Sequence, residues 1–198
     1  MWRREFLSGA ALGASAAVGA AKAKPPSERV ALGFIGVGTR GADGLLKTFL
    51  KLNECDCLAV CDPMRDRRDK WTQTVEETYG ERKRSGLFKG CNAYNDFREV
   101  LQRSDLDAVV IATPDHWHVP IATAAARAGK DMYVEKPLGL SISQNLAARR
   151  VIRENKRIFQ YGTQQRGAPH VRFGCELIRS GRLGKIHSIE VWAPAGSP

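Results

Sequence analysis

Cysteine and aromatic residues are scarce in this chain, and it has no long hydrophobic run. Its 198 residues include 5 cysteines, and aromatic side chains make up 8%. So few cysteines, in an odd number, exclude a disulfide-stabilised scaffold. Cys55, Cys57 and Cys61 lie close together, but no Cys or His pair follows at the spacing of a zinc site, so no metal site is predicted. We predict that they pack as small apolar side chains in a strand.

The first 24 residues predict an export signal. They contain Arg3-Arg4 near the start, followed by an uncharged Ala- and Gly-rich stretch at 9–21 and a small-x-small site at 21–23. This layout is that of a signal peptide, and the arginine pair before Phe6-Leu7 resembles the twin-arginine signal. The stretch is shorter than the roughly 20 apolar residues of a membrane span, so we expect no stable membrane anchor. We predict export to the periplasm by the twin-arginine machinery.

Short apolar runs alternate with helical patterns along the rest of the chain. Ordinary proportions of apolar (43%) and charged (26%) residues also indicate a globular protein. Strands are predicted at 30–35, 57–61, 108–112, 132–134, 158–161 and 186–192. Helices are predicted at 45–52, 64–79, 96–101, 119–128, 141–155 and 171–179, and a basic surface loop at 81–90. Strands that alternate with helices favour an α/β fold with a doubly wound parallel sheet.

A glycine-rich turn follows the first predicted strand. Residues 36–41 fit the pattern G-x-G-x-x-G, and Asp62 ends the next strand 21 residues after the last of these glycines. The first glycine allows a sharp turn, the second lets backbone amides approach a pyrophosphate, and the third permits close packing of helix and strand. We predict a dinucleotide site whose phosphate-binding turn contains Gly36, Gly38, Thr39, Arg40 and Gly41.

The cofactor predicted for this site is NAD. Asp62 can accept hydrogen bonds from the ribose hydroxyls, and its negative charge would repel a 2′-phosphate. NADP stays open as an alternative, because Arg65 and Arg67 lie close enough in the sequence to meet that phosphate.

Two further polar segments directly follow predicted strands. They are Thr-Pro-Asp-His-Trp-His at 113–118 and Glu-Lys-Pro at 135–137. Ligands of an open α/β sheet lie beyond the carboxyl ends of its strands, so we expect both segments to meet the dinucleotide site. A partly desolvated Lys136 suits acid–base work or the polarisation of a substrate oxygen. His116 and His118 are alternative proton carriers.

Taken in order, these motifs resemble the glucose–fructose oxidoreductase, inositol dehydrogenase and MocA family. The resemblance spans about residues 29–192 and includes V-C-D-P, A-T-P-D-H-W-H, G-K-D-M-Y-V-E-K-P-L and G-T-Q-Q-R. It implies a Rossmann-like domain at 29–160 and, at 161–198, only the beginning of a second, α+β substrate domain. It also implies NAD(P)-dependent hydride transfer at a carbinol carbon of a sugar, inositol or related polyol.

The resemblance also implies roles for individual residues. Lys136 and His118 are the expected catalytic residues. By residue match, the nicotinamide side is formed by Thr113, Pro114, His118, Glu135 and Lys136, and the substrate edge by Gln165 and Arg166. An Asp or Asn and a His that relatives carry in the second domain would fall beyond residue 198. We therefore interpret the chain as an N-terminal piece, and expect a homo-oligomer for a full-length form.

Three other functions are compatible with parts of the sequence. An NAD-dependent, redox-neutral glycosidase uses the same fold, but the intact Glu-Lys-Pro motif favours simple dehydrogenation. A non-catalytic dinucleotide-binding module fits the missing downstream residues. The net charge of +10 and the basic run at 82–84 suggest a nucleic-acid binder. That run lies in a predicted loop without interleaved aromatics, so we predict a solvated basic surface and no nucleic-acid partner.

Overall fold

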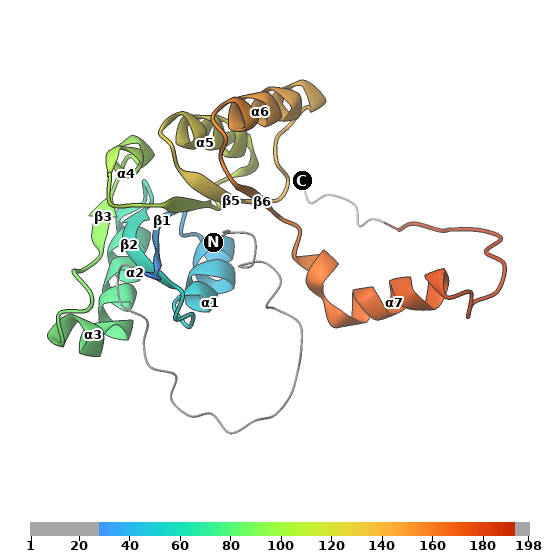
Figure 1. Ribbon diagram of the computed structural model, residues 1–198, viewed down its shortest axis with the longest axis horizontal. Coiled ribbons are helices and arrows are strands. Elements are labelled where there is room, and N and C mark those ends of the chain that lie inside the picture. Colours follow the sequence, from blue (N-terminus) through green and yellow to red (C-terminus); the bar gives the residue numbers. More distant parts are fainter. Residues whose placement is uncertain (1–27, 193–198) are drawn as a thin grey trace.

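Six short segments form one parallel sheet in the computed structural model, which describes residues 28–192. The strands are β1 (Val30–Ile35), β2 (Cys55–Cys61), β3 (Asn92–Tyr94), β4 (Ala108–Ile111), β5 (Asp131–Glu135) and β6 (Phe159–Gly162). They lie in the order β3-β2-β1-β4-β5-β6, and each neighbouring pair is parallel (Figure 1). This confirms the predicted α/β class, and the strand order is that of the Rossmann fold.

Helices cover both faces of the sheet, because alternate residues of each buried strand point to opposite sides. Phe34 belongs to a core under the first set of helices, and its neighbour Ile35 belongs to the core on the other face. The first set comprises η3 (Arg40–Leu46), α1 (Lys47–Phe49), α2 (Arg65–Thr78) and the short α3 (Gly80–Arg84) beside α2. The second comprises α4 (Phe97–Gln102), α5 (Asp115–Arg127) and α6 (Ile142–Glu154) (Figure 1).

Two helical segments near the site, η3 and α5, begin about one turn earlier than predicted. The segment η3 starts at Arg40, directly at the glycine turn, and winds as a π-helix before α1 continues it. Helix α5 starts at Asp115, because Pro114 stands at its N-cap and cannot donate a backbone hydrogen bond. The two histidines of segment 113–118 therefore lie on the first helical turn and not in a loop.

On the β3 side of the sheet, the structure corrects one sequence prediction and adds one strand that was not predicted. The predicted loop at 81–90 begins with helix α3, where Arg82 pairs with Asp56 and stacks on the Tyr79 ring. These tertiary contacts order Arg82, whereas the side chains of Lys83 and Arg84 remain exposed, as predicted for a solvated basic surface. The edge strand β3 was not predicted, because its three residues are too short and too polar to give a strand pattern.

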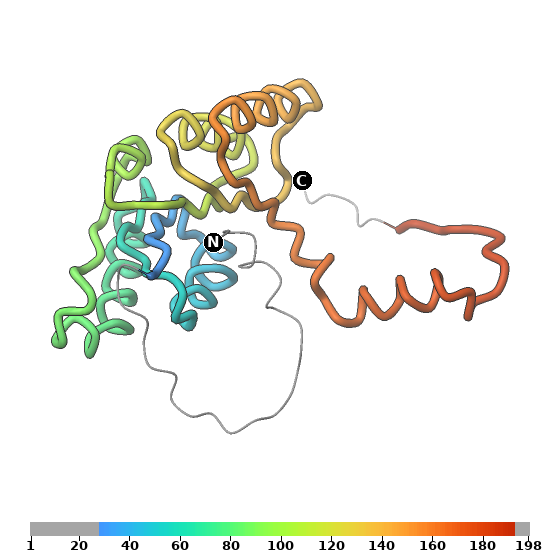
Figure 2. Tube along the Cα trace, viewed as in Figure 1, coloured from blue at the N-terminus to red at the C-terminus, as the bar shows by residue number. Residues whose placement is uncertain are grey.

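The chain beyond β6 leads away from the sheet, as Figure 2 shows. It contains η4 (Gln164–Gly167) and α7 (Pro169–Arg179), and α7 buries none of its residues. The strand predicted at 186–192 is absent, since these residues are exposed and have no neighbouring strand within 28–192. The domain boundary predicted near residue 160 stays a prediction.

The predicted export signal lies outside the described residues, so it and the periplasmic location also stay predictions. Among residues 28–192 no helix has the length and apolar character needed to cross a bilayer.

Burial of four of the five cysteines yields a test of the core. Cys175 is exposed, whereas burial raises the pKa of Cys55 and of Cys61 to about 12. A thiol with this pKa holds about a thousandfold less thiolate at pH 8 than a free cysteine, and the thiolate is the nucleophile. We expect iodoacetamide to modify only Cys175 in the native chain and all five cysteines in guanidinium, as counted by mass spectrometry. Rapid native labelling of a second cysteine would contradict this packing.

Candidate cofactor and substrate site

The glycine turn packs too closely for side chains at its first and third glycines. Gly36 has φ +86°, and a Cβ on it would lie 2.7 Å from the Ala112 carbonyl oxygen. A Cβ on Gly41 would lie 2.0 Å from the Gly36 carbonyl oxygen, a distance that backbone atoms cannot tolerate. A Cβ on Gly38 would approach only the mobile end of Arg67, at 3.4 Å. The turn is thus closed towards the sheet and open above Gly38.

Asp62 follows β2 and connects the glycine turn to helix α2. The residue is 5% exposed. Its Oδ2 accepts a hydrogen bond from the Val37 amide at 3.0 Å, and its Oδ1 accepts one from the Met64 amide at 2.9 Å. A carboxylate can accept about four hydrogen bonds, so both oxygens keep acceptor capacity for a ribose hydroxyl. Asp62, the residue predicted to bind the ribose, therefore also holds two backbone segments in place.

An ion pair joins the glycine turn to the end of β5. Glu135 is 2% exposed, and its Oε1 accepts a hydrogen bond from Arg40 Nε at 2.8 Å and lies 2.6 Å from Arg40 Nη2 in an ion pair. The bond to Glu135 raises the pKa of Arg40, while burial and then the charge of Glu135 raise the pKa of Tyr133 beside it. A buried carboxylate needs such a partner, because its desolvation is otherwise uncompensated. Arg40 thus points to Glu135, the residue next to Lys136.

His118 lies beneath the two loops that follow β4 and β5. Its ring is 1% exposed, with Nε2 2.9 Å from the Thr113 carbonyl oxygen and Nδ1 2.5 Å from the Pro137 carbonyl oxygen. Both ring nitrogens therefore face backbone acceptors of the protein. This placement favours a positioning role over the proton transfer predicted from the sequence.

Two open pockets lie at the edge of the sheet where the parallel strands have their carboxyl ends, together with the loops that follow these strands. We call this edge the rim. One, of about 500 Å³, is lined by Lys136 together with Thr163, Gln164, Gln165 and Arg166. It brings the predicted catalytic lysine together with both predicted substrate residues. Because Glu135 is tied to Arg40, this pocket lies on the same rim as the dinucleotide turn.

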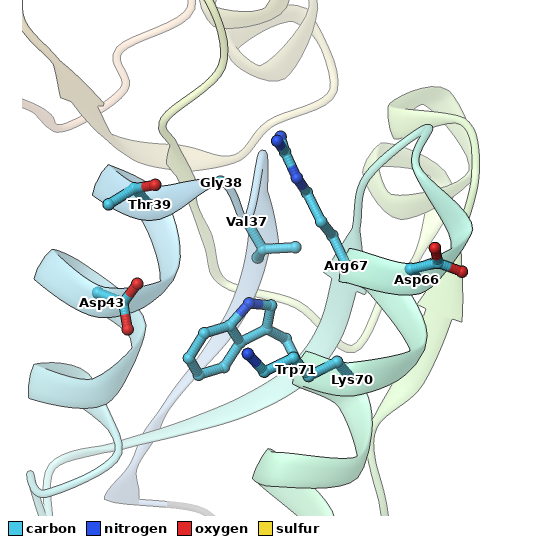
Figure 3. A pocket seen from close by; sticks show the side chains of 8 residues that line it. All are labelled: Val37, Gly38, Thr39, Asp43, Asp66, Arg67, Lys70 and Trp71. Atoms are coloured by element: carbon cyan, nitrogen blue, oxygen red, sulfur yellow. The ribbon is translucent and has the colours of Figure 1, made fainter.

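The second pocket, of about 250 Å³, lies between the glycine turn and helix α2 (Figure 3). Figure 3 shows the Arg67 side chain rising from α2 beside Gly38, with Trp71 deeper in the pocket. Sequence reasoning identified Arg67 but not Lys70 and Trp71, which follow it at helical spacing. It also did not identify Asp66 of α2 or Asp43 of η3. The lining residues are Val37, Gly38, Thr39, Asp43, Asp66, Arg67, Lys70 and Trp71.

The rim has the features that a nicotinamide dinucleotide requires. Gly38 leaves room for a pyrophosphate at the start of η3, and Asp62 offers a carboxylate to the ribose. After β4, the buried Thr113 hydroxyl has no hydrogen-bond partner among residues 28–192 and is free to bind a ligand. The residues present therefore fit NAD or NADP. Within 28–192, no group of three or more His, Cys, Asp or Glu side chains is arranged to hold a metal ion.

Strand order, glycine turn and carboxylate together define a dinucleotide-binding Rossmann domain. The sequence profile of the GFO_IDH_MocA oxidoreductase family, NAD-binding Rossmann fold, matches residues 30–163. The chain therefore belongs to this family, and residues 30–163 are its NAD(P)-binding domain.

The curated relatives include glycosidases. A glycosyl hydrolase family 109 protein of Shewanella pealeana is 38% identical over 120 residues, which are 61% of this chain and 25% of that protein. An alpha-N-acetylgalactosaminidase of Shewanella oneidensis is 34% identical over 122 residues, with the same coverage. The chain thus spans about a quarter of the length of these relatives.

Solved structures show the same fold at low sequence identity. A scyllo-inositol dehydrogenase from Lactobacillus casei, with bound NAD(H) and scyllo-inositol, matches with TM-score 0.67 and 24% identity, covering 79% of this chain and 42% of that one. A 3-ketoreductase from Actinomadura kijaniata in complex with NADP matches with TM-score 0.68 and 22% identity, covering 79% and 46%.

The different surroundings of Gly38 and Gly41 predict opposite effects of one substitution. Gly41→Ala forces a methyl group against the Gly36 carbonyl, so we expect a loss of about 3 kcal/mol or more in the free energy of unfolding. Gly38→Ala meets only a flexible side chain and should change that free energy by less than about 1 kcal/mol.

The same Gly38→Ala methyl group stands where the pyrophosphate approaches, so NAD affinity should fall about tenfold or more. Urea denaturation and calorimetric titration with NAD measure the two effects separately. A Gly38→Ala chain that binds NAD as well as the native chain would show that the phosphates lie elsewhere.

Proposed function

We propose that this chain binds NAD at the glycine turn and serves hydride transfer between nicotinamide and a carbinol carbon of a sugar or polyol. The observation that carries the proposal is the ion pair between Arg40 of the turn and Glu135, beside Lys136. It joins the part of the rim that contains the glycine turn, the cofactor half, to the part that contains the pocket lined by Lys136. Membership in the oxidoreductase family supports the same chemistry.

Each residue of the rim has a role in this proposal. When bound, the nicotinamide accepts or supplies the hydride. Lys136 exchanges the hydroxyl proton of the substrate, because its side chain lines the open pocket. Gln165 and Arg166, in the same pocket, bind substrate hydroxyls and orient the carbinol carbon. Thr113 and Pro114 flank the nicotinamide side.

The preferred cofactor in this proposal is NAD. Asp62 presents a buried carboxylate at the end of β2, and a 2′-phosphate beside it would be repelled. Arg67 and Lys70 in the neighbouring pocket offset part of that repulsion, so NADP is expected to bind more weakly rather than be excluded.

A cofactor titration tests the role of Asp62. In Asp62→Ala we expect NAD affinity to fall about tenfold, through lost ribose hydrogen bonds, and the preference for NAD over NADP to narrow. Asp69→Ala, on the exposed face of α2, is the matched control and should leave both affinities unchanged. An unaltered NAD to NADP ratio in Asp62→Ala would show that this carboxylate does not select the cofactor.

A second candidate is a glycosidase that oxidises its sugar transiently and returns the hydride. The family 109 relatives favour it, since they match this chain at 34 to 38% identity. The cofactor half of the rim serves both reactions, whereas the groups that would cleave a glycosidic bond are not identified among residues 28–192. Lys136 suits dehydrogenation of a free alcohol, so we place the dehydrogenase first.

One set of assays separates these functions. The chain is titrated with NAD, then incubated with NAD and inositol or aldoses while reduced nicotinamide is followed by absorbance. Hydrolysis of 4-nitrophenyl α-N-acetylgalactosaminide is measured in parallel. We expect binding at micromolar NAD and oxidation of a polyol or sugar. Lys136→Met should abolish turnover and change NAD affinity less than about threefold, whereas Lys51→Met, an exposed control, should change neither.

Other outcomes of these assays would indicate a different function. Hydrolysis of the glycoside without net reduction of NAD would establish the glycosidase. NAD binding without either reaction would indicate a binding module. No binding of NAD or NADP at about 1 mM would overturn the proposal, because family domains must hold the cofactor to act.

A further inference from the structure

The loops after β4 and β5 are held to one buried side chain. The His118 ring approaches the Thr113 carbonyl with one nitrogen and the Pro137 carbonyl with the other. Thr113 precedes helix α5, and Pro137 follows Lys136 directly. We propose that His118 is a positioning residue that fixes the backbone on either side of the cofactor's reactive end and thereby sets the place of Lys136. This proposal rests on the function assigned above to Lys136.

The support of the ring is rigid. His118 lies on the first turn of α5, a helix whose inner face packs in the core under β4 and β5. Its neighbours Val119, Ile121 and Ala122 are buried in that core, so the ring cannot follow the loops if they move. Helix α5 therefore provides a fixed support for the loops after β4 and β5.

The link depends on the nitrogen atoms and not only on the volume of the ring. Both partners are carbonyl oxygens, which only accept hydrogen bonds, so each needs an N–H from the ring. A neutral imidazole donates to one loop, and an imidazolium donates to both. A phenyl ring fills the same space and donates to neither, which makes it the informative replacement.

Lys136 lies at an open pocket, in contrast to the buried His118. Its side chain lines the open 500 Å³ pocket with Gln165 and Arg166, whereas the His118 ring is 1% exposed. The buried ring can reach the reacting atoms only through the backbone that carries the lysine. Misplacement of a catalytic group by about 1 Å is enough to lower the reaction rate about 100-fold. The position of this backbone therefore affects the rate.

The test measures the reactivity of Lys136 in the cofactor-free chain. Trinitrobenzenesulfonate labels the native chain and the variants, and peptide mapping gives the Lys136 rate relative to exposed Lys51. In His118→Phe we expect this ratio to change about fivefold, the factor of one lost hydrogen bond. His118→Gln retains an amide donor and should give an intermediate ratio.

Lys130→Met is the matched control. The buried Lys130 ammonium also holds two backbone carbonyls, those of Arg103 and Leu106, but before β5 rather than after it. This substitution should lower the melting temperature while leaving the Lys136 ratio unchanged. An equal shift in Lys130→Met and His118→Phe would overturn the proposal, because general loosening would then explain both. So would an unchanged ratio in folded His118→Phe.

If His118→Phe does not fold, His118→Gln decides by the same ratio, and an unchanged value there contradicts the positioning role. Because labelling needs no cofactor, its outcome is independent of the NAD titration. Failure of the native chain to bind NAD would count against the proposed function alone, and an unaltered lysine ratio against the role of His118 alone.

Discussion

The contact between Gly41 and the Gly36 carbonyl is the constraint on which the candidate site depends. With no side chain between them, the start of η3 lies directly on the turn that leaves β1. This close approach places the first amides of the helical segment at the rim of the sheet, where parallel strands present their carboxyl ends. Arg40 leaves the same turn, so its reach to Glu135 also depends on this contact.

Three polar links then join the loops of the rim into one unit. Asp62 binds the Val37 amide, Arg40 binds Glu135, and His118 bridges the Thr113 and Pro137 carbonyls. Each link is formed by a buried group, and buried polar groups are costly unless they are paired. The rim is therefore held by the same hydrogen-bond requirements that stabilise the interior. A site built in this way is preorganised before any ligand arrives.

Much of the fold could be predicted from the sequence, because its signals are local. Apolar runs located five of the six strands, and the glycine pattern with Asp62 located the turn. The link between Arg40 and Glu135 joins residues 95 positions apart, and no periodicity reports such a pairing. The burial of His118 follows from where α5 begins, and a shift of a few residues in a helix start turns a side chain from solvent into the core. Helix α3 is likewise ordered by distant partners such as Asp56.

The double duty of Asp62 has a consequence for anyone who wishes to redesign the coenzyme choice of this domain. Exchanging the acid for a neutral residue removes the repulsion but also releases the Val37 and Met64 amides, so selectivity and rigidity change together. Lys70 and Asp66 of α2 line the pocket beside the glycine turn. Within residues 28–192, neither side chain forms a hydrogen bond that holds the backbone in place, as Asp62 does. Altering charge there offers a route to a different nucleotide with the architecture of the turn left intact.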